Sequence, residues 1–341
     1  MKAAVYCGRE DIRIEEMPKP KIGDDEVLVE MKACGVCGSD LMDWYLEKRA
    51  PLVLGHEPVG VITEKGGKVK SFQVGDRVFV HHHVADMTCH YCAHGDYTLC
   101  SQFHNTNILP GGFSEYFKVP AANLQFDTLE IPEKISDEQA TFIEPVGCCL
   151  RAARKCNIQA GDVVAVVGAG TTGILHVALA RLSGAACVIA SDLFDGRLGM
   201  AKKYGADAIV NPKTEDVLIV VRSLTDGIGA DVVIVTAPTL QAYETGMRIC
   251  RKGGRVCVFA PTEPEAHLKI SPMELFFSEV QIVPSYSTSH LETRAALELI
   301  ESGRLSVEPL VTHRFPLERT ADAFKTARTD GESLKVIVSN G

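Results

Sequence analysis

The sequence of this 341-residue chain predicts an α/β protein in which a mainly β region precedes a doubly wound parallel sheet. Two observations support this fold class. From about Gly161 onward, apolar runs of Val, Ile and Ala alternate with helical segments, as they do where helices cover both faces of a parallel sheet. Before that point, short strand-like segments are separated by Gly-Asp and Gly-Gly turns. The length suits two domains, each with a core of its own.

The elements follow in chain order. In the first third we expect strands at 26–34, 59–65 and 77–80. In the second region we expect strands at 163–167, 187–191, 208–210, 231–236 and 255–260, and helices at 172–183, 195–204, 214–225 and 240–250. After about residue 285 the pattern predicts a helix at 291–302, a short strand around 307–311, another helix and a final strand at 334–338. It leaves open whether these last elements extend the parallel sheet or return to the first domain.

Charge and composition exclude several classes of partner. The net charge is -9 and the chain has no basic run, so we expect it to bind neither nucleic acid nor an anionic membrane surface. The first 16 residues are charged throughout and lack the apolar core of a signal peptide, so we expect a soluble, cytoplasmic protein. The uncharged stretch 163–180 contains three glycines and is better explained as a strand, a turn and a helix than as a membrane span.

Twelve cysteines are many for a chain of this length. Disulfides are typical of exported proteins, and we expect no export signal here. Cys89, Cys92 and Cys100 fall within one short segment, which favours metal ligation. Three others lie in apolar strands and are expected to be small buried hydrophobes, namely Cys187, Cys250 and Cys257.

A glycine turn between an apolar strand and an apolar helix predicts a dinucleotide site. Gly168-Ala169-Gly170-Thr171-Thr172-Gly173 follows the strand at 163–167 and opens the next helix. Gly168 permits the tight turn, Gly170 lets a pyrophosphate approach the backbone amides, and Gly173 allows close helix–strand contact. The alternative is a glycine turn that binds nothing.

Asp192, at the end of the next strand, has the position of the acid that binds the adenosine ribose hydroxyls. Its carboxylate would repel a 2′-phosphate, and the following Leu193-Phe194 offers no basic replacement. We therefore expect NAD rather than NADP. Arg197, one helical turn further on, is expected to pack over the adenine or to pair with Asp192.

Cys37, His56, Glu57 and Glu144 supply the three protein ligand types of a catalytic zinc, which keeps one position open for water or substrate. The hydroxyl of Ser39 is expected to reach a zinc-bound alcohol, and Asp40 to hold the second nitrogen of His56. Taken singly, each residue has another interpretation. His56 can be a core histidine whose hydrogen bonds are all made within the protein, and Cys34-x-x-Cys37 can be a redox pair or two cysteines that only pack in the core. Their joint occurrence is what predicts the metal.

A second group, Asp86-x-x-Cys89-x-x-Cys92-x7-Cys100, describes a closed structural zinc site. Aspartate is acceptable in this set because zinc is borderline soft and takes carboxylate oxygen. His90 and His94 lie inside the same loop and are alternative ligands. The preceding histidines 81–83 are expected to form a solvated loop.

Several of these motifs, taken in order, resemble those of the zinc-dependent medium-chain dehydrogenases. They are Gly55-His56-Glu57, the cysteine lobe and the glycine turn, supported by GDRV at 75–78, GGFSEY at 111–116, Glu144-Pro145 and GGRV at 253–256. The resemblance covers essentially the whole chain and points to the polyol branch, the sorbitol or L-iditol 2-dehydrogenases, with threonine dehydrogenases as near neighbours. Two positions depart from the common pattern. Glu144 stands at the third ligand position, as in polyol and sugar dehydrogenases, and Asp86 stands where most relatives have cysteine.

The resemblance implies a Rossmann domain at 148–284 that binds NAD, and a GroES-like, mainly β catalytic domain at 1–147 that residues 285–341 complete. It implies Cys37, His56 and either Glu57 or Glu144 on a catalytic zinc, with the other glutamate bound directly or through water. It also implies a homotetramer or homodimer.

Together these features predict a zinc-dependent, NAD-linked dehydrogenase that oxidises a secondary alcohol, a polyol or sugar alcohol, to the ketone. Zinc would lower the pKa of the alcohol, Ser39 would begin the proton path, and the nicotinamide would accept the hydride. Trp44 and Tyr45 are expected to line the substrate pocket, although either can belong to the core.

Other functions remain open. A dehydrogenase for L-threonine or another small secondary alcohol is the nearest alternative. A zinc-free quinone or enone reductase shares the fold but has no use for Cys37, His56 and Glu57. A non-enzymatic NAD-binding protein should lose the open zinc site, and a purely structural zinc protein does not need Asp192.

Overall fold

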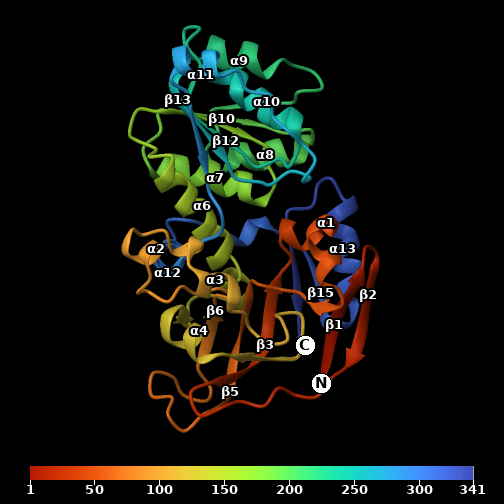
Figure 1. The fold of residues 1–341 in the computed structure, drawn as a ribbon. Coiled ribbons are helices and arrows are strands. Elements are labelled where there is room, and N and C mark those ends of the chain that lie inside the picture. The colour runs from red at the N-terminus through yellow and green to blue at the C-terminus, as the bar shows by residue number, and fades with distance from the viewer. Residues whose placement is uncertain (341) are drawn as a thin grey trace. The chain divides into compact units, whose positions relative to one another are not determined.

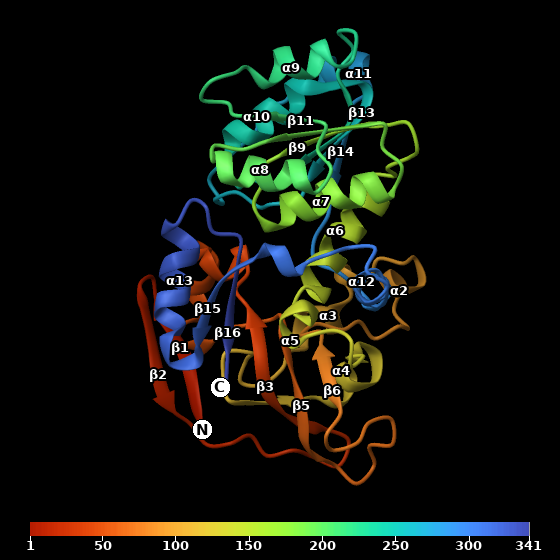
Figure 2. The same ribbon diagram turned by 180° about the vertical axis from the view of Figure 1, so that it is seen from behind.

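A computed structural model describes residues 1–340, which form two compact units (Figures 1 and 2). Unit 1 comprises Met1–Gly147 and the segment that begins at Thr288, and unit 2 comprises Cys148–Ser287. Helix α6 (Ile143–Lys155) carries the chain from unit 1 into unit 2. Each unit is described by itself below.

Unit 2 is built on a sheet that is parallel throughout. Among the described residues its strands are β9 (Val163–Val167), β10 (Cys187–Ser191), β11 (Ala208–Val210), β12 (Ala230–Val235), β13 (Cys250–Val258) and β14 (Gln281–Pro284). Their spatial order is β11-β10-β9-β12-β13-β14. The sheet therefore begins at its centre with β9 and winds outward in both directions, which confirms the doubly wound α/β class.

Helices cover both faces of this sheet. They are α7 (Thr171–Leu182), α8 (Asp195–Lys203), α9 (Val217–Ser223), α10 (Leu240–Ile249) and α11 (Pro272–Ser278). Figures 1 and 2 show α9 and α10 on one face and α7 and α8 on the other. Because both faces are covered, the central strands carry apolar side chains in nearly every position, and Val164, Val166 and Val233 are buried.

Unit 1 is mainly β. Its strands before residue 147 are β1 (Lys2–Gly8), β2 (Asp11–Glu16), β3 (Val27–Gly35), β4 (Leu52–Val53), β5 (Pro58–Lys65), β6 (Arg77–Val80), β7 (Tyr116–Val119) and β8 (Thr128–Glu130). Its helices are the short α1 (Asp43–Leu46), α2 (His90–Ala93), α3 (Ser101–Asn105), α4 (Ala121–Phe126) and α5 (Asp137–Ala140), and the longer α12 (His290–Glu301) and α13 (Thr320–Thr329). The expected strands at 26–34, 59–65 and 77–80 are confirmed as β3, β5 and β6.

The C-terminal strands β15 (Val311–Pro316) and β16 (Lys335–Ser339) belong to unit 1. Strand β16 runs antiparallel to β3, with Val338 opposite Cys34, and extends the larger sheet of this unit in the order β15-β16-β3-β5-β6-β8. Figure 2 shows β16 beside β3 although the two strands stand at opposite ends of the sequence. The end of β3 is where the candidate metal cluster begins.

Some expected elements differ in the structure. Residues 307–311 were expected to form a strand, but Glu308–Leu310 is a 3-10 turn with proline near its start, and the strand is Val311–Pro316. Proline fits the first turn of a helix and cannot donate to a sheet ladder, which explains the difference. Helix α11 and strand β14 were not expected. Cys257 is buried as expected, but Cys187 and Cys250 are only half-buried.

Among residues 1–340, no helix is both long enough and apolar enough to span a membrane. The apolar stretch 163–180 is divided between β9 and α7, as the glycine turn predicts.

Candidate functional site

The structure brings together the side chains of Cys37, His56 and Glu57. One ligand atom of each lies within 4.8 Å of the others. Strand pairing explains this, because β3 and β5 are antiparallel with Cys34 opposite Pro58. Cys37 follows the end of β3, and His56-Glu57 precedes the start of β5, so the two loops meet at one end of the ladder.

The imidazole of His56 is oriented by Asp40. Its Nδ1 lies 3.3 Å from Asp40 Oδ1, and Asp40 Oδ2 accepts a hydrogen bond of 3.1 Å from the Cys37 backbone N–H. Ser39 Oγ lies 3.4 Å from Nε2, the other ring nitrogen. Burial acts to lower the pKa of His56, but the nearby Asp40 and Cys37 outweigh it and raise that pKa well above its usual range.

Glu57 is fully buried, and its two carboxylate oxygens have different surroundings. Its Oε2 pairs with the ammonium of Lys335, while its Oε1 is buried with no hydrogen-bond partner among residues 1–340. Burial raises the pKa of Glu57, with Lys335 opposing that shift. An unpartnered carboxylate oxygen beside a thiol and an imidazole fits a zinc ion, because zinc takes all three donor types. Lys335 was not expected in this site.

Glu144, in the first turn of α6, stands outside this three-atom group. It is buried, and its charge helps to raise the pKa of Glu57, so it lies in the same neighbourhood. The sequence left open which of the two glutamates is the direct ligand. The geometry favours Glu57.

Trp44 and Tyr45 lie on the short helix α1, close after the Cys37 loop. Their rings are 5.9 Å apart, and Tyr45 is exposed while Trp44 is half-buried. The Arg49 guanidinium donates a hydrogen bond of 3.1 Å to the Tyr45 hydroxyl. Neither aromatic ring is part of the buried core, so both remain available to contact a substrate.

The second group, Asp86, Cys89, Cys92 and Cys100, also converges. One ligand atom of each lies within 4.8 Å of the others. Asp86 Oδ1 accepts hydrogen bonds from the backbone N–H groups of Thr88 and Cys89, at 2.7 and 2.8 Å, and these hold the pKa of the Asp86 carboxyl well below its usual range. Burial raises the pKa of the Cys92 thiol to about 12. Four converging donors fit a closed zinc site, since an ion would stabilise the thiolates.

His90 and His94, the alternative ligands in this lobe, stand outside the group. Their rings contact each other at 4.4 Å, and His94 Nδ1 lies 2.8 Å from the His90 carbonyl oxygen. Both side chains are exposed. The geometry therefore favours Asp86 over either histidine.

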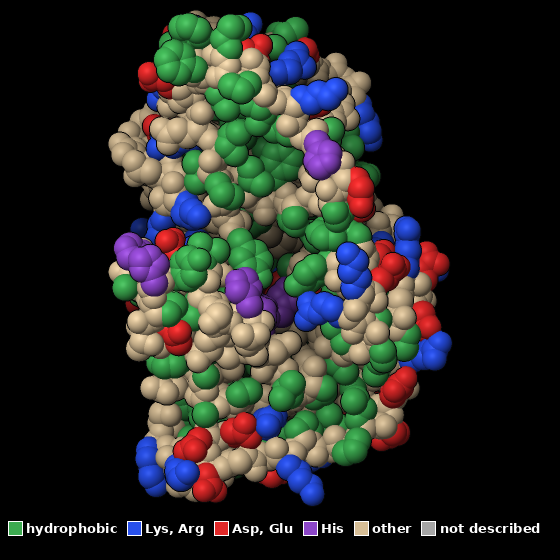
Figure 3. All heavy atoms as spheres, in the orientation of Figure 1, with side chains coloured by type: hydrophobic (Ala, Val, Ile, Leu, Met, Phe, Trp, Pro, Cys, Tyr) green, Lys and Arg blue, Asp and Glu red, His purple; other side chains and the backbone are tan. Residues whose placement is uncertain are grey.

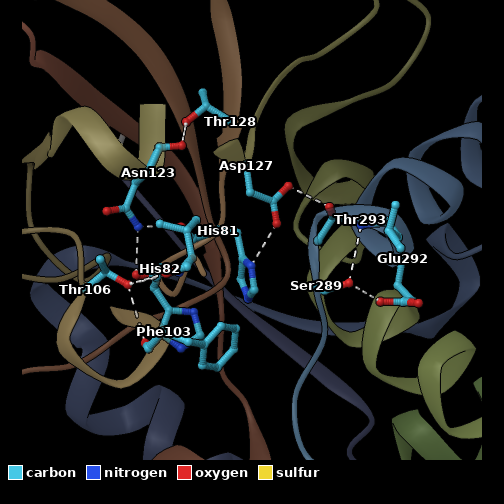
Figure 4. A network of polar contacts seen from close by, with 12 residues as sticks. His81, His82, Phe103, Thr106, Asn123, Asp127, Thr128, Ser289, Glu292 and Thr293 are labelled. Atoms are coloured by element: carbon cyan, nitrogen blue, oxygen red, sulfur yellow. Dashed lines mark hydrogen bonds and ion pairs between the residues drawn. The ribbon is translucent and has the colours of Figure 1, made fainter. Parts of the chain in front are cut away.

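The expectation of a solvated loop at 81–83 is wrong. His81 is fully buried, with Nδ1 2.8 Å from Asp127 Oδ2, and Asp127 Oδ1 accepts a hydrogen bond of 2.6 Å from the Thr293 hydroxyl (Figure 4). The His82 ring lies 5.0 Å from that of His56. His82 therefore lies beside the Cys37 cluster. The partner of His81 is distant in sequence, so it left no local signal.

In unit 2 the glycine turn has a backbone geometry that favours glycine at two positions. Gly168 has φ +103°, and a Cβ on Gly173 would lie 2.0 Å from the Gly168 carbonyl oxygen, so neither position accepts a side chain without strain. A Cβ on Gly170 would meet nothing closer than 3.9 Å. Helix α7 begins there without a side-chain cap, which leaves its first N–H groups available to an anion.

Asp192 follows β10 and is held on this turn. Its Oδ2 accepts a hydrogen bond of 2.7 Å from Ala169 N–H, and its Oδ1 accepts one of 3.0 Å from Phe194 N–H. Two cations lie on the Phe194 ring, Arg197 at 5.1 Å and Lys213 at 5.2 Å. Lys213 thus supplies a basic group near Asp192 that the sequence of the turn itself does not show.

Comparison with known families assigns both parts of the chain. Residues 23–132 match the alcohol dehydrogenase GroES-like domain, and residues 171–302 match the zinc-binding dehydrogenase domain.

Known relatives match along nearly the whole chain. The sorbitol dehydrogenase of Bacillus subtilis strain 168 is 35% identical over 99% of this chain and 97% of its own length. The L-threonine 3-dehydrogenase of Pyrococcus furiosus is 33% identical over 99% and 97%. A crystal structure from Sinorhizobium meliloti 1021, described as a zinc-binding dehydrogenase bound to NADP, is 29% identical, with a TM-score of 0.88 over 99% of this chain and 98% of its own.

Proposed function

Since this chain belongs to the zinc-dependent medium-chain dehydrogenases, and is therefore an oxidoreductase, we propose that it oxidises a secondary alcohol of the polyol or sugar-alcohol type to a ketone, with NAD as hydride acceptor. The observation that carries this proposal is the convergence of Cys37, His56 and Glu57, in which Glu57 Oε1 is buried and has no partner. A thiolate, an imidazole and a carboxylate leave one position of a tetrahedral zinc open for an alcohol oxygen.

The residues around this cluster have separate tasks. A zinc ion held by Cys37, His56 and Glu57 would act as a Lewis acid that lowers the pKa of the alcohol. Asp40 fixes the His56 ring through Nδ1, which leaves Nε2 for the metal. The Ser39 hydroxyl, 3.4 Å from that nitrogen, would begin the proton path by accepting the proton of the alcohol while it releases its own proton to water.

Unit 2 is proposed to bind the dinucleotide. The turn Gly168–Gly173 and the uncapped start of α7 would hold the pyrophosphate, with Thr171 and Thr172 supplying backbone N–H groups, while the Ala169 N–H holds Asp192 on the turn. The Asp192 carboxylate would accept hydrogen bonds from the adenosine ribose and repel a 2′-phosphate. Arg197 and Lys213, which lie on the Phe194 ring, would instead attract a 2′-phosphate. The preference between NAD and NADP therefore depends on the negative charge of Asp192 against these two positive charges.

The lobe at 86–100 is proposed to hold a structural zinc through Asp86, Cys89, Cys92 and Cys100. All four donors come from one short segment and converge on one another, which leaves no open position for a substrate. This zinc would stabilise the lobe and take no part in the chemistry.

We also propose a cytoplasmic homo-oligomer. Helix α11 exposes Met273, Phe276 and Phe277, at 67%, 76% and 72%, on the surface of unit 2. Figure 3 shows hydrophobic side chains gathered on unit 2 where Figure 1 places α9 and α11. Large apolar side chains exposed side by side are typical of a subunit interface.

The test is a substrate panel with the purified, zinc-loaded protein. Polyols, simple secondary alcohols and amino alcohols including L-threonine are each offered with NAD and with NADP, and reduced nicotinamide is followed by absorbance. We expect the largest kcat/KM for a polyol with NAD. A preference for L-threonine would replace the polyol assignment, and reduction of quinones without zinc would contradict the proposed activity altogether.

A further inference from the structure

The three consecutive histidines differ in how their ring nitrogens are satisfied. His81 Nδ1 is bonded to Asp127, and His83 Nδ1 lies 2.6 Å from the Thr106 carbonyl oxygen. His82 Nδ1 is buried and has no partner among the described residues. A buried polar atom without a partner is destabilising, so the fold keeps this nitrogen at a cost.

His82 is also the member of the run that faces the proposed zinc cluster. Its ring lies 5.0 Å from the His56 ring, and His56 is in turn next to the Ser39 hydroxyl. His81 Nε2 lacks a partner as well, but His81 is fully buried and held by Asp127. His82 is half-buried, so its ring is not wholly enclosed by neighbouring side chains.

The backbone of this run is rigidly held, which gives His82 a fixed position. The Asn123 amide donates hydrogen bonds to the carbonyl oxygens of His81 and His82, at 2.9 and 2.8 Å (Figure 4). The His81–Asp127–Thr293 chain ties the same segment to α12. A polar group that neighbouring elements hold in place is suited to selecting a ligand by a directed hydrogen bond.

We propose that His82 hydrogen-bonds a second hydroxyl of the substrate, on the carbon next to the one that is oxidised, and so selects polyols over monohydric alcohols. This inference rests on the proposed dehydrogenase function, because it takes the reacting hydroxyl to lie at the Cys37–His56–Glu57 cluster. An imidazole ring nitrogen either donates or accepts, so it suits a hydroxyl in either role. A substrate hydroxyl would satisfy the nitrogen that the protein leaves unbonded.

The test compares two alcohols that differ only in the second hydroxyl, butane-2,3-diol and butan-2-ol. The measured quantity is the ratio of their kcat/KM values with NAD, for the zinc-loaded wild type and for His82→Phe. We expect the wild type to prefer the diol and His82→Phe to lower that ratio about tenfold or more, the loss expected for one hydrogen bond to the substrate. His82→Gln, which keeps a hydrogen-bonding group, should restore part of the preference.

Two further measurements keep the result interpretable. His104→Phe, which changes an exposed histidine on α3, should leave the ratio unchanged. Trp44 is the single tryptophan of the chain and lies close after the Cys37 loop, so quenching of its fluorescence by the diol gives a binding readout independent of turnover. In the His82→Phe variant, binding of the diol should weaken more than binding of butan-2-ol does.

The outcomes separate the two proposals. If His82→Phe folds and lowers both rates equally, or if the wild type does not prefer the diol, the role of His82 is wrong and the dehydrogenase function stands. If the zinc-loaded wild type oxidises neither alcohol nor any polyol of the panel, the proposed function is wrong and the role of His82 falls with it.

Discussion

The ammonium group of Lys335 is paired with the carboxylate of Glu57 inside unit 1, although the two residues are 278 positions apart in the chain. Both side chains are buried, and Lys335 Nζ also lies 3.4 Å from the Val36 carbonyl oxygen. Strand β16 therefore does more than extend the sheet. It carries the cation that holds one oxygen of Glu57, while the other oxygen has no hydrogen-bond partner among the described residues.

Replacing this lysine should destabilise the protein. Lys335→Met leaves the Glu57 carboxylate buried without a counter-charge, which costs about 3–5 kcal/mol where one partner of a buried pair is removed. We expect a matching loss in the free energy of unfolding, measured by urea denaturation. The control is Lys2→Met, which breaks the exposed pair with Glu318 and should leave the unfolding midpoint nearly unchanged. Equal midpoints for the two variants would contradict the role of Lys335.

His176, on α7, should make unit 2 sensitive to acid. It is fully buried, neither ring nitrogen has a hydrogen-bond partner within the described part of the chain, and burial lowers its pKa to about 3. The unfolded chain therefore binds a proton below about pH 6.5 that the folded chain refuses until about pH 3, so stability falls as the pH falls through this window. His176→Leu should raise the free energy of unfolding and flatten its pH dependence between these limits. His267→Leu, an exposed position in the same unit, should change neither.

The lobe at 86–100 should contribute to the thermal stability of the protein and not to its chemistry. Cys92→Ser is expected to lower the thermal midpoint or change the oligomer, with the substrate preference of the surviving enzyme unchanged. Cys7→Ser, at a half-buried thiol on β1, is the matched control. Asp86→Cys should retain zinc at least as tightly as the wild type, because a thiolate is the softer ligand. A metal-replete crystal with an ordered lobe and no ion beside these residues would show that contacts among the side chains alone hold the loop.

Asp192 should set the cofactor preference. Asp192→Asn removes the negative charge and keeps one oxygen that can accept a hydrogen bond, where the carboxylate accepts one from Ala169 N–H and one from Phe194 N–H. We expect the NADP-to-NAD ratio of kcat/KM to rise by about tenfold, which corresponds to roughly 1.4 kcal/mol of repulsion, because Arg197 and Lys213 then face the 2′-phosphate without a competing carboxylate. If the wild type already prefers NADP, the carboxylate does not exclude the phosphate.

Local patterns in the sequence were sufficient for much of the fold. The β9–turn–α7 segment was predicted because an apolar strand, a spaced set of glycines and a helical pattern follow one another within 20 residues. The doubly wound sheet was predicted from the local alternation of apolar strands and helices, and the strand order of the structure confirms it. Strand β14 was missed because it is a short edge strand, and its partly exposed side chains, with Pro284 at its end, give no buried run.

The site was predictable only where its ligands carry a recognisable spacing. The Cys37, His56 and Glu57 set and the 86–100 lobe were named from motifs, and the structure brings each set together; their roles as zinc ligands stay predictions. Lys335 and the burial of His81 were not predicted. Their partners, Glu57 and Asp127, come from distant elements, and only the tertiary fold brings them into contact.

The most direct test of the central claim is the rate of NADH formation from a polyol as zinc is removed and returned. Chelation should abolish turnover of the wild type, and added zinc should restore it. The Cys37→Ala variant should bind one zinc fewer per chain and stay inactive, although it still binds NAD. Turnover that persists in fully metal-depleted protein would contradict a catalytic zinc at Cys37, His56 and Glu57.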